Sequence, residues 1–197
     1  NKKIKVSIFN NKYDLQIKKG HIKNILILLS VLKCLNLDIG KILKKIKNLK
    51  ILEGRGKVSS VKYKKIKFNL IDESYNANPL SMKESIVNFS KIKTKKTNKY
   101  LLLGDMLELG NKTNKLHKRL VPYVNNSDID KLFVHGKKIV KIYKNIKKNK
   151  QGNILQHKSD VKDTILPIIQ NNDYLMIKGS NGTGLYKISN NLIKGKY

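Results

Sequence analysis

The chain has 197 residues, of which 40% are hydrophobic and 28% charged, and its mean hydropathy is −0.43. This length fits one domain, or one domain and part of another, and the apolar content is enough to form a core. A single cysteine excludes a disulfide scaffold and a CxxC metal site. The longest apolar run, residues 25–32, is shorter than the roughly 20 residues that a membrane helix needs, so we expect no membrane span and a cytoplasmic protein.

Basic residues outnumber acidic residues by 43 to 13, which gives a formal net charge of +30. Such a charge is typical of proteins that bind nucleic acid or anionic surfaces. All but two of the basic residues are lysine, however, and lysine, asparagine and isoleucine share A/T-rich codons. The lysines are spread over the whole chain, and aromatic residues are not interleaved with them as a stacking platform requires. We therefore expect no nucleic-acid partner, and a basic nucleic-acid-binding α/β domain remains the alternative of a different class.

The first part of the chain has its own pattern. Residues 3–17 alternate in two short segments around Asn10-Asn11, which predicts a hairpin. Residues 22–36 carry apolar side chains so densely that we expect a helix buried on most of its circumference. Residues 37–49 alternate apolar pairs with lysine at helical spacing, which predicts a second, amphipathic helix. The chain opens in mid-pattern without methionine, which favours a piece of a longer protein.

After Gly54-Arg55-Gly56, strand and helix patterns alternate. Strands are expected at residues 58–63, 66–72, 100–103, 132–135, 154–156 and 174–177, and helices at 79–92, 114–124, after 136, at 161–169 and from 184. Repeated β-α units with short connections predict an α/β fold: an open, mostly parallel, Rossmann-like sheet with helices on both faces.

Four polar or glycine-rich segments follow expected strands. They are DESYNANP at 72–79, GDMLELG at 104–110, VHG at 134–136 and KGSNGTG at 178–184. In parallel α/β sheets ligands bind at the carboxyl ends of strands, although such segments also occur as turns and helix caps. The last segment lacks the GK[ST] of a P-loop, and no Walker A motif occurs in the chain, so a phosphate-gripping loop would have to lie elsewhere.

Histidine and arginine are the other residue types in the chain that could bind a ligand. The four histidines form no i, i+4 pair and none neighbours the cysteine, so no metal site is predicted. Arg55 stands between two glycines in a chain that otherwise uses lysine. A guanidinium binds phosphate or a nucleotide with a planar fork that lysine lacks, but an exposed linker arginine explains the same pattern.

Taken in order, these segments resemble the C-terminal region of the Mur ligase family. GRG comes first, then SYNANP, then GDMLELG followed by His117, and finally KGSNGTG. The resemblance implies that residues 1–51 are the end of a central ATP-binding domain and residues 52–197 a Rossmann-like C-terminal domain. It also implies a longer enzyme, with a uridine-binding domain and most of the central domain outside this chain.

The resemblance implies ATP contacts at three positions. Arg55 matches an arginine that reaches the nucleotide. Glu73 stands where many members have an aspartate that binds the ribose hydroxyls. Asn24 matches an asparagine near the adenine, although His21 precedes it by three residues instead of the family's four.

The resemblance also implies substrate contacts, at Tyr75, Asn76, Asn78, Lys178 and Ser180. It places no catalytic residue and no metal ligand in this chain, because the family's P-loop, modified lysine and magnesium carboxylate have no counterpart here.

The function implied is an ATP- and Mg²⁺-dependent amide ligase of peptidoglycan synthesis, and hence of cell shape and division. Its partners would be UDP-N-acetylmuramoyl-tripeptide and D-alanyl-D-alanine, and it would work as a monomer. The tripeptide carboxylate would attack the γ-phosphate to give an acyl phosphate, from which the amine of the dipeptide displaces phosphate. We expect the chain to be inactive alone. Another Mur-type ligase, or a folylpolyglutamate-type ligase, remains an alternative with the same reaction.

Overall fold

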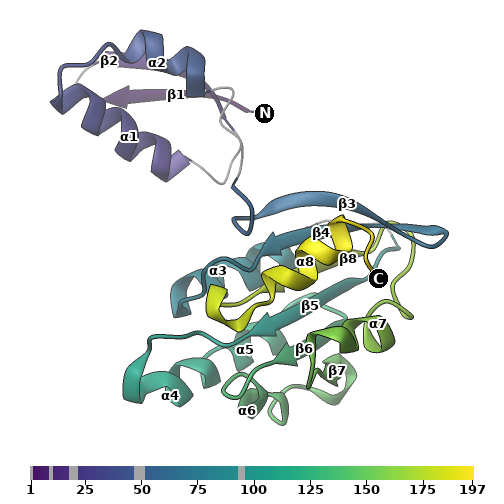
Figure 1. The fold of residues 1–197 in the computed structure, drawn as a ribbon. Helices are drawn as coiled ribbons and strands as arrows, with labels where there is room; N and C mark the ends of the chain where they lie inside the picture. Colours follow the sequence, from purple (N-terminus) through teal and green to yellow (C-terminus); the bar gives the residue numbers. More distant parts are fainter. Residues whose placement is uncertain (1, 9–10, 18–21, 47–51, 93–95) are drawn as a thin grey trace. The chain divides into compact units, whose positions relative to one another are not determined.

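The computed structural model describes residues 2–8, 11–17, 22–46, 52–92 and 96–197. The chain divides into two compact units, Asn1–Lys50 and Ile51–Tyr197 (Figure 1).

The first unit is a hairpin with two helices. Strands β1 (Lys2–Ile8) and β2 (Asn11–Ile17) pair antiparallel, as the alternating pattern predicts, and Asn10 of the expected turn lies outside the described residues. Helices α1 (Ile22–Cys34) and α2 (Ile39–Ile46) follow, and the expected extension of α2 to 49 also lies outside them. The core of this unit consists of Val6, Ile25, Leu29, Leu32 and Ile39.

The expectation that α1 is buried on most of its circumference is wrong within this unit. Ile27 is 64% exposed, and Leu28 and Val31 are exposed as well. A helix can bury only the faces that neighbouring elements cover. In the first unit those neighbours are one hairpin and one short helix, which leave the other side of α1 open.

The second unit is built on a six-stranded sheet. Its strands are β3 (Lys57–Tyr63), β4 (Ile66–Glu73), β5 (Lys99–Gly104), β6 (Lys131–His135), β7 (Gln151–Ile154) and β8 (Tyr174–Lys178). The strand order is β3-β4-β8-β5-β6-β7, and every neighbouring pair is parallel except β3 with β4. The predicted open, mostly parallel sheet is confirmed.

Helices cover both faces of this sheet, as predicted (Figure 1). One face packs against α3 (Pro79–Ser90), α4 (Thr113–Lys118), α5 (Val121–Asn125) and α6 (Val140–Tyr143). The other packs against α7 (Val161–Thr164) and α8 (Tyr186–Ile193). Leu101 and Leu103 of β5 belong to the first core, and Tyr100 and Leu102 to the second, because successive strand residues point to opposite faces. Short 3₁₀ turns complete the unit: η2 (Gly110–Lys112), η3 (Lys148–Lys150), η4 (Lys158–Asp160) and η5 (Asn181–Thr183).

Proline explains two differences from the expected helices. The helix expected at 114–124 is two helices, because the ring of Pro122 cannot be accommodated against the carbonyl of Lys118, where α4 ends. The helix expected at 161–169 stops at Thr164, three residues before Pro167, for the same reason.

The strand expected at 154–156 lies earlier, at Gln151–Ile154, and shares only Ile154 with the expected range. Gly152 allows this strand to lie close to β6, because a Cβ atom on Gly152 would be 2.7 Å from the ring of Phe133. A local pattern does not reveal such a close approach.

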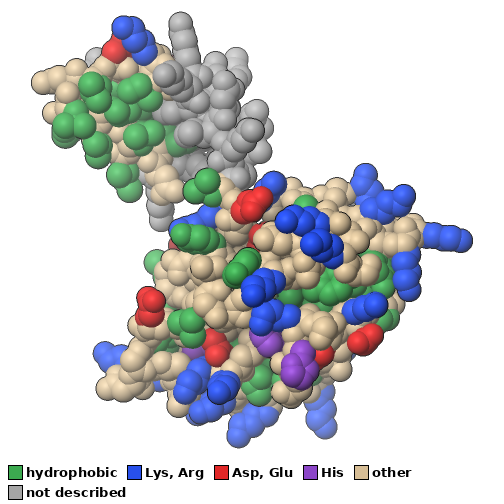
Figure 2. Space-filling model, in the orientation of Figure 1, with side chains coloured by type: hydrophobic (Ala, Val, Ile, Leu, Met, Phe, Trp, Pro, Cys, Tyr) green, Lys and Arg blue, Asp and Glu red, His purple; other side chains and the backbone are tan. Residues whose placement is uncertain are grey.

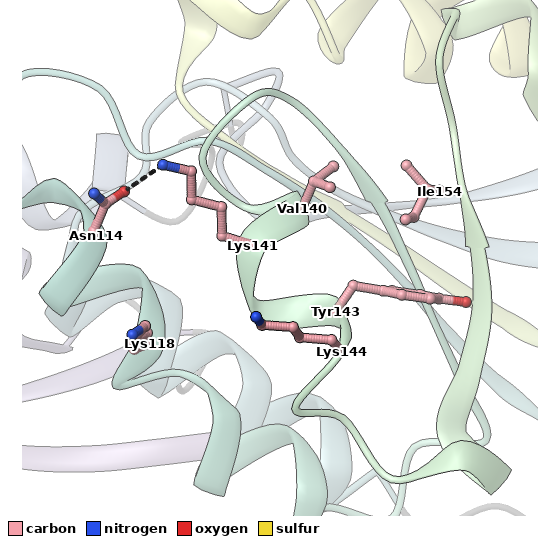
Figure 3. Close-up of a pocket in the computed structure, with 7 residues that line it drawn as sticks. All are labelled: Asn114, Lys118, Val140, Lys141, Tyr143, Lys144 and Ile154. Atoms are coloured by element: carbon pink, nitrogen blue, oxygen red, sulfur yellow. Dashed lines mark hydrogen bonds between the residues drawn. The ribbon is translucent and has the colours of Figure 1, made fainter.

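The surface of the molecule shows the lysines as scattered groups rather than a continuous stripe on the face drawn in Figure 2. No helix among the described residues is long and apolar enough to span a bilayer. A hollow of about 510 Å³ lies between α4, α6 and β7 (Figure 3).

Candidate functional site

The candidate site lies at the carboxyl edge of the sheet, where β4, β8 and β5 end side by side. Glu73 is the register partner of Lys178, and Lys178 is also the partner of Leu103. The segments that follow these strands therefore meet, which confirms the expectation that DESYNANP, GDMLELG and KGSNGTG share one edge.

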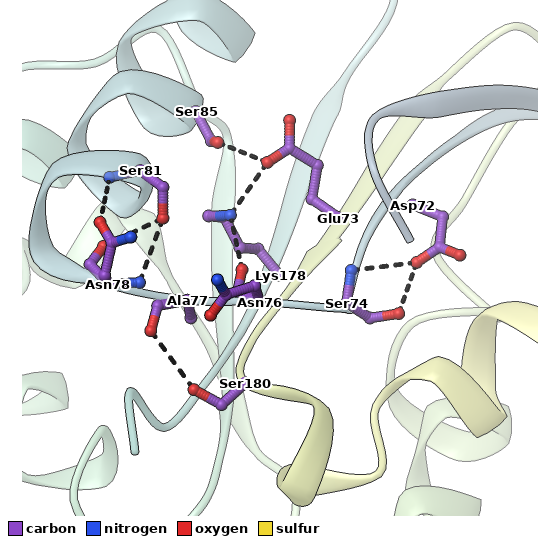
Figure 4. Close-up of polar contacts among 10 residues, drawn as sticks. All are labelled: Asp72, Glu73, Ser74, Asn76, Ala77, Asn78, Ser81, Ser85, Lys178 and Ser180. Atoms are coloured by element: carbon purple, nitrogen blue, oxygen red, sulfur yellow. Dashed lines mark hydrogen bonds and ion pairs between the residues drawn. The ribbon is translucent and has the colours of Figure 1, made fainter. Parts of the chain in front are cut away.

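Lys178 and Glu73 form a hydrogen-bonded ion pair at this edge. The Nζ atom of Lys178 lies 3.0 Å from Oε2 of Glu73 and donates a second bond, of 3.1 Å, to the carbonyl of Asn76 (Figure 4). Ser85 of α3 donates to the same carboxylate oxygen at 2.6 Å. The lysine side chain is only 3% exposed, so these partners replace the water that would otherwise surround its ammonium group. The pair therefore fixes the Glu73 carboxylate and the chain at Asn76.

Ser180 joins the three segments through its hydroxyl and its backbone. Its Oγ donates to the carbonyl of Ala77 and accepts a 3.0 Å bond from the N–H of Leu107. Its own N–H donates to the carbonyl of Asp105 at 3.0 Å. The Ser180 side chain is thus buried, with both of its hydrogen-bonding roles in use.

Arg55 lies over the ring of Tyr75, with 4.4 Å from its guanidinium carbon to the ring centroid. The preceding residue, Gly54, accepts a bond from the Tyr75 N–H, and a Cβ atom on Gly54 would lie 2.7 Å from that of Tyr75. Cation–π contact and close backbone approach together hold the arginine at the edge of the SYNANP segment. Tyr75 is 51% exposed, so this pair faces solvent.

Asp72, which was not predicted as a site residue, holds the GRG loop, Ser74 and α8 together at this edge. Its buried carboxylate accepts from the N–H groups of Gly54 and Ser74 and from the hydroxyls of Ser74 and Ser189. A carboxylate with several donors is strongly held. In the sequence, the feature that could have indicated this role is the position of Asp72 at the end of an apolar strand.

Asp105 and His117 hold the GDMLELG segment in a similar way. The Asp105 carboxylate accepts from the N–H groups of Lys138 and Ile139, before α6. Buried His117 accepts from the Met106 N–H at its Nε2 atom, so its Nδ1–H donates to the carbonyl of Thr113. Only the motif order drew attention to His117.

The remaining predicted residues occupy different environments. Asn76 is exposed and gives its carbonyl to Lys178. Asn78 is the N-cap of α3, where its side-chain oxygen accepts from the Ser81 N–H at 2.8 Å. Asn24 is an exposed residue of α1 in the first unit, and His21 lies outside the described residues.

No set of three histidine, cysteine, aspartate or glutamate side chains that could hold a metal ion occurs in the part of the chain that the structure describes. The carboxylates at the edge are already paired with lysine, serine and backbone donors. The described residues therefore do not fit a magnesium site by themselves.

A family model described as "Mur ligase, glutamate ligase domain" matches residues 60–181. The chain belongs to the Mur ligase family. The matched part of this Mur ligase chain runs from within β3 to Asn181, and so includes SYNANP, GDMLELG and the first four residues of KGSNGTG.

Curated relatives from two bacteria, each named UDP-N-acetylmuramoyl-tripeptide–D-alanyl-D-alanine ligase, are similar to this Mur ligase chain. The Rickettsia prowazekii protein is 28% identical over 160 residues, which are 81% of this chain and 34% of the relative. The Bacillus subtilis protein is 31% identical over 135 residues, 64% of this chain and 28% of the relative. The chain thus spans about a third of the length of these relatives.

Solved structures of the same family share the fold. The MurF ligase of Thermotoga maritima, solved in complex with ADP, superposes with a TM-score of 0.71 at 21% identity, over 96% of this chain and 42% of that one. A MurF structure from Acinetobacter baumannii gives a TM-score of 0.75 at 19% identity, over 93% of this Mur ligase chain and 40% of its own.

Proposed function

We propose that this chain is the C-terminal part of an ATP-dependent ligase that adds D-alanyl-D-alanine to UDP-N-acetylmuramoyl-tripeptide. The names of the curated relatives support this substrate pair. The observation that carries the proposal is the convergence of GRG, SYNANP, GDMLELG and KGSNGTG at one edge of the sheet. Residues 1–51 would then be the end of the central ATP-binding domain and residues 52–197 the C-terminal domain.

In this proposal the edge binds the nucleotide through groups that the fold holds in advance. Arg55 would contact the phosphates. Its stacking on Tyr75 uses the face of the guanidinium group, so the N–H groups at its edge can still donate to oxyanions. Glu73 would accept hydrogen bonds from the ribose hydroxyls at its Oε1 atom, because Lys178 and Ser85 both bind its Oε2 atom. Asn24 would lie near the adenine. Holding these groups in place lowers the cost of ordering them when ATP binds.

The peptide substrates would contact the exposed part of the same edge. Tyr75, Asn76 and Asn78 present side chains there, and Asn78 keeps its amide nitrogen available while its oxygen caps α3. Lys178 and Ser180 are buried, so they would act by fixing the neighbouring backbone rather than by touching substrate.

The reaction would proceed through an acyl phosphate of the tripeptide, which the dipeptide amine then attacks. Transfer of a phosphoryl group depends mostly on positioning and on charge stabilisation. This chain would supply positioning and would exclude water from the acyl phosphate. The preceding domains would supply the phosphate loop and the ligands for Mg²⁺, in a monomeric enzyme of the cytoplasm.

The test is phosphate release by the full-length ligase that contains this chain, together with the mass of the product. We expect release to require ATP, the UDP-linked tripeptide and D-alanyl-D-alanine together. Release with glutamate in place of the dipeptide would instead favour a folylpolyglutamate-type ligase. Tight retention of the chain on DNA at about 0.15 M salt, with no ligase activity, would favour the nucleic-acid alternative.

A further inference from the structure

The hollow between α4, α6 and β7 is lined by side chains that have no role in the proposed ligase site. It is lined by Asn114, Lys118, Val140, Lys141, Tyr143, Lys144 and Ile154 (Figure 3). Its volume of about 510 Å³ is within the range of small-molecule sites. It borders the edge strand β7, which is separated from β5 by β6, so it is distinct from the carboxyl-edge site at β4, β8 and β5.

The charged side chains that line this hollow are all lysines, so its charge is positive. Lys141 of α6 and Lys144, which follows the end of α6, extend toward α4, which carries Lys118 (Figure 3). Lys141 donates a long bond of 3.4 Å to Asn114, and among the described residues none of the three lysines has an ion-pair partner. None of the described residues that line the hollow is acidic. Ammonium groups that share a hollow repel one another, and a bound anion would relieve this repulsion.

The floor of the hollow is apolar and fixed. Val140, Ile154 and the ring of Tyr143 form it, and the Tyr143 hydroxyl donates to the carbonyl of Gly152. The Gln151 side chain donates to the carbonyls of Tyr143 and Ile146, which ties the end of α6 to β7. Burial raises the pKa of the Tyr143 phenol, as expected beside an apolar surface. A ligand would therefore meet a floor that is already formed.

From this arrangement we propose that the hollow binds an oxyanion attached to a planar or apolar group, of about the size of a mononucleotide. The three lysines and Asn114 bind the oxyanion, and Val140, Tyr143 and Ile154 contact the uncharged part. The inference does not depend on ligase activity.

The experiment is titration of the purified chain with adenosine monophosphate, inorganic phosphate and adenosine, followed by calorimetry and by amide NMR shifts at about 0.1 M salt, where the Debye length is about 10 Å. We expect the monophosphate to bind more tightly than phosphate, adenosine not to bind, and shifts to concentrate in 113–118 and 140–144. The double variant Lys141→Gln/Lys144→Gln should weaken monophosphate binding roughly tenfold or more.

A charge-matched control separates this site from general attraction to a basic protein. Lys187→Gln/Lys194→Gln removes the same charge from exposed lysines at α8, which covers the other face of the sheet. It should change binding less than about twofold. Equal weakening in both variants, equal binding of phosphate and monophosphate, or shifts confined to Arg55 and Tyr75 would overturn the proposal. The last outcome would still agree with the proposed ATP site.

Discussion

Arg55 shows how one side chain links the local sequence to the proposed chemistry. Two glycines flank it, and the guanidinium rests on the Tyr75 ring instead of extending freely into solvent. An arginine held in this way can bind an anion with little further loss of side-chain freedom. The opposite case is Lys178, whose ammonium is occupied by Glu73 and the Asn76 carbonyl. In the proposed site, exposure rather than charge distinguishes the cation that would bind a ligand from the one that would position the backbone.

We expect Arg55→Lys to impair use of ATP in the full-length ligase although the charge is kept. Loss of one charged hydrogen bond costs about 1.5–3 kcal/mol, so kcat/KM for ATP should fall roughly 10- to 100-fold. Steady-state kinetics with ATP varied measures this, and a melting curve checks the fold. Arg119→Lys, at the other, exposed arginine, is the matched control and should leave the kinetics unchanged. Wild-type kinetics in the Arg55 variant would make Arg55 an exposed linker residue.

Tyr100 gives a prediction on stability and pH. Burial raises the pKa of its phenol to about 12, and nearby Asp173 and Asp130 act in the same direction. The unfolded chain releases this proton near pH 10, while the folded chain keeps it to about pH 12. Its contribution to stability is therefore complete below pH 10 and is lost as the pH rises from 10 to 12, by up to about 2–3 kcal/mol.

The measurement is urea unfolding of the wild type and Tyr100→Phe between pH 8 and about pH 11.5. The two proteins share every other titratable group, so the difference between the two curves isolates Tyr100. The wild type should lose stability more steeply than the variant above pH 10. Parallel curves would mean that the phenol ionises at its ordinary pKa.

At the level of elements, the GRG loop and the SYNANP segment are held together by hydrogen bonds to Asp72. Gly54 and Gly56 have positive φ angles of 71° and 85°, and the N–H groups of both bind Asp72. These two bonds hold the GRG loop against the end of β4, where Asp72 lies. A change that separates these two segments should move Arg55 away from Tyr75.

Gly54→Ala is expected to destabilise the second unit more than Gly110→Ala. Both glycines have positive φ, which costs an alanine about 1–2 kcal/mol. Only at Gly54 would the new methyl group meet Tyr75, at 2.7 Å from its Cβ and 2.9 Å from its nitrogen, whereas Gly110 has open space. We expect an additional loss of about 1–3 kcal/mol at Gly54, measured by urea unfolding. Equal losses would show that the loop moves away from Tyr75 at little cost.

At the level of the whole molecule, the two units have separate cores of very different size. Among the residues that the structure describes, the first unit has five buried apolar side chains, whereas the second has two extensive clusters, one on each face of its sheet. Burial of apolar surface is the main source of stability, so the second unit carries most of it. The proposed ligase would add domains to this pair of units.

Removal of residues 1–50 is expected to leave the melting temperature of the second unit nearly unchanged. Its clusters are built from residues between Val61 and Leu192, all of which the shortened chain retains. Differential scanning calorimetry of the full chain and of residues 51–197 measures the effect. A fall of more than about 10 °C would show that the first unit contributes to the stability of the sheet.

The sequence predicted the fold class because its strands and helices alternate with short connections. It also predicted that three motif segments share an edge, since parallel strands end on the same side of a sheet. The split of the helix at 114–124 was in principle readable, because Pro122 is visible in the sequence. The exposed side of α1 was not readable, because an apolar pattern does not reveal which elements cover it.

The sequence by itself thus determined the fold class, the family and the segments that form the candidate site. Only the tertiary structure decided what each side chain does there. β8 enters the sheet between β4 and β5, which places Lys178 beside Glu73, although 105 positions separate them in the chain. The same insertion brings Ser180 to Ala77 and Leu107, and Ser189 to Asp72. Such partners follow from strand order, which depends on how whole elements pack, and local sequence patterns carry no information on it.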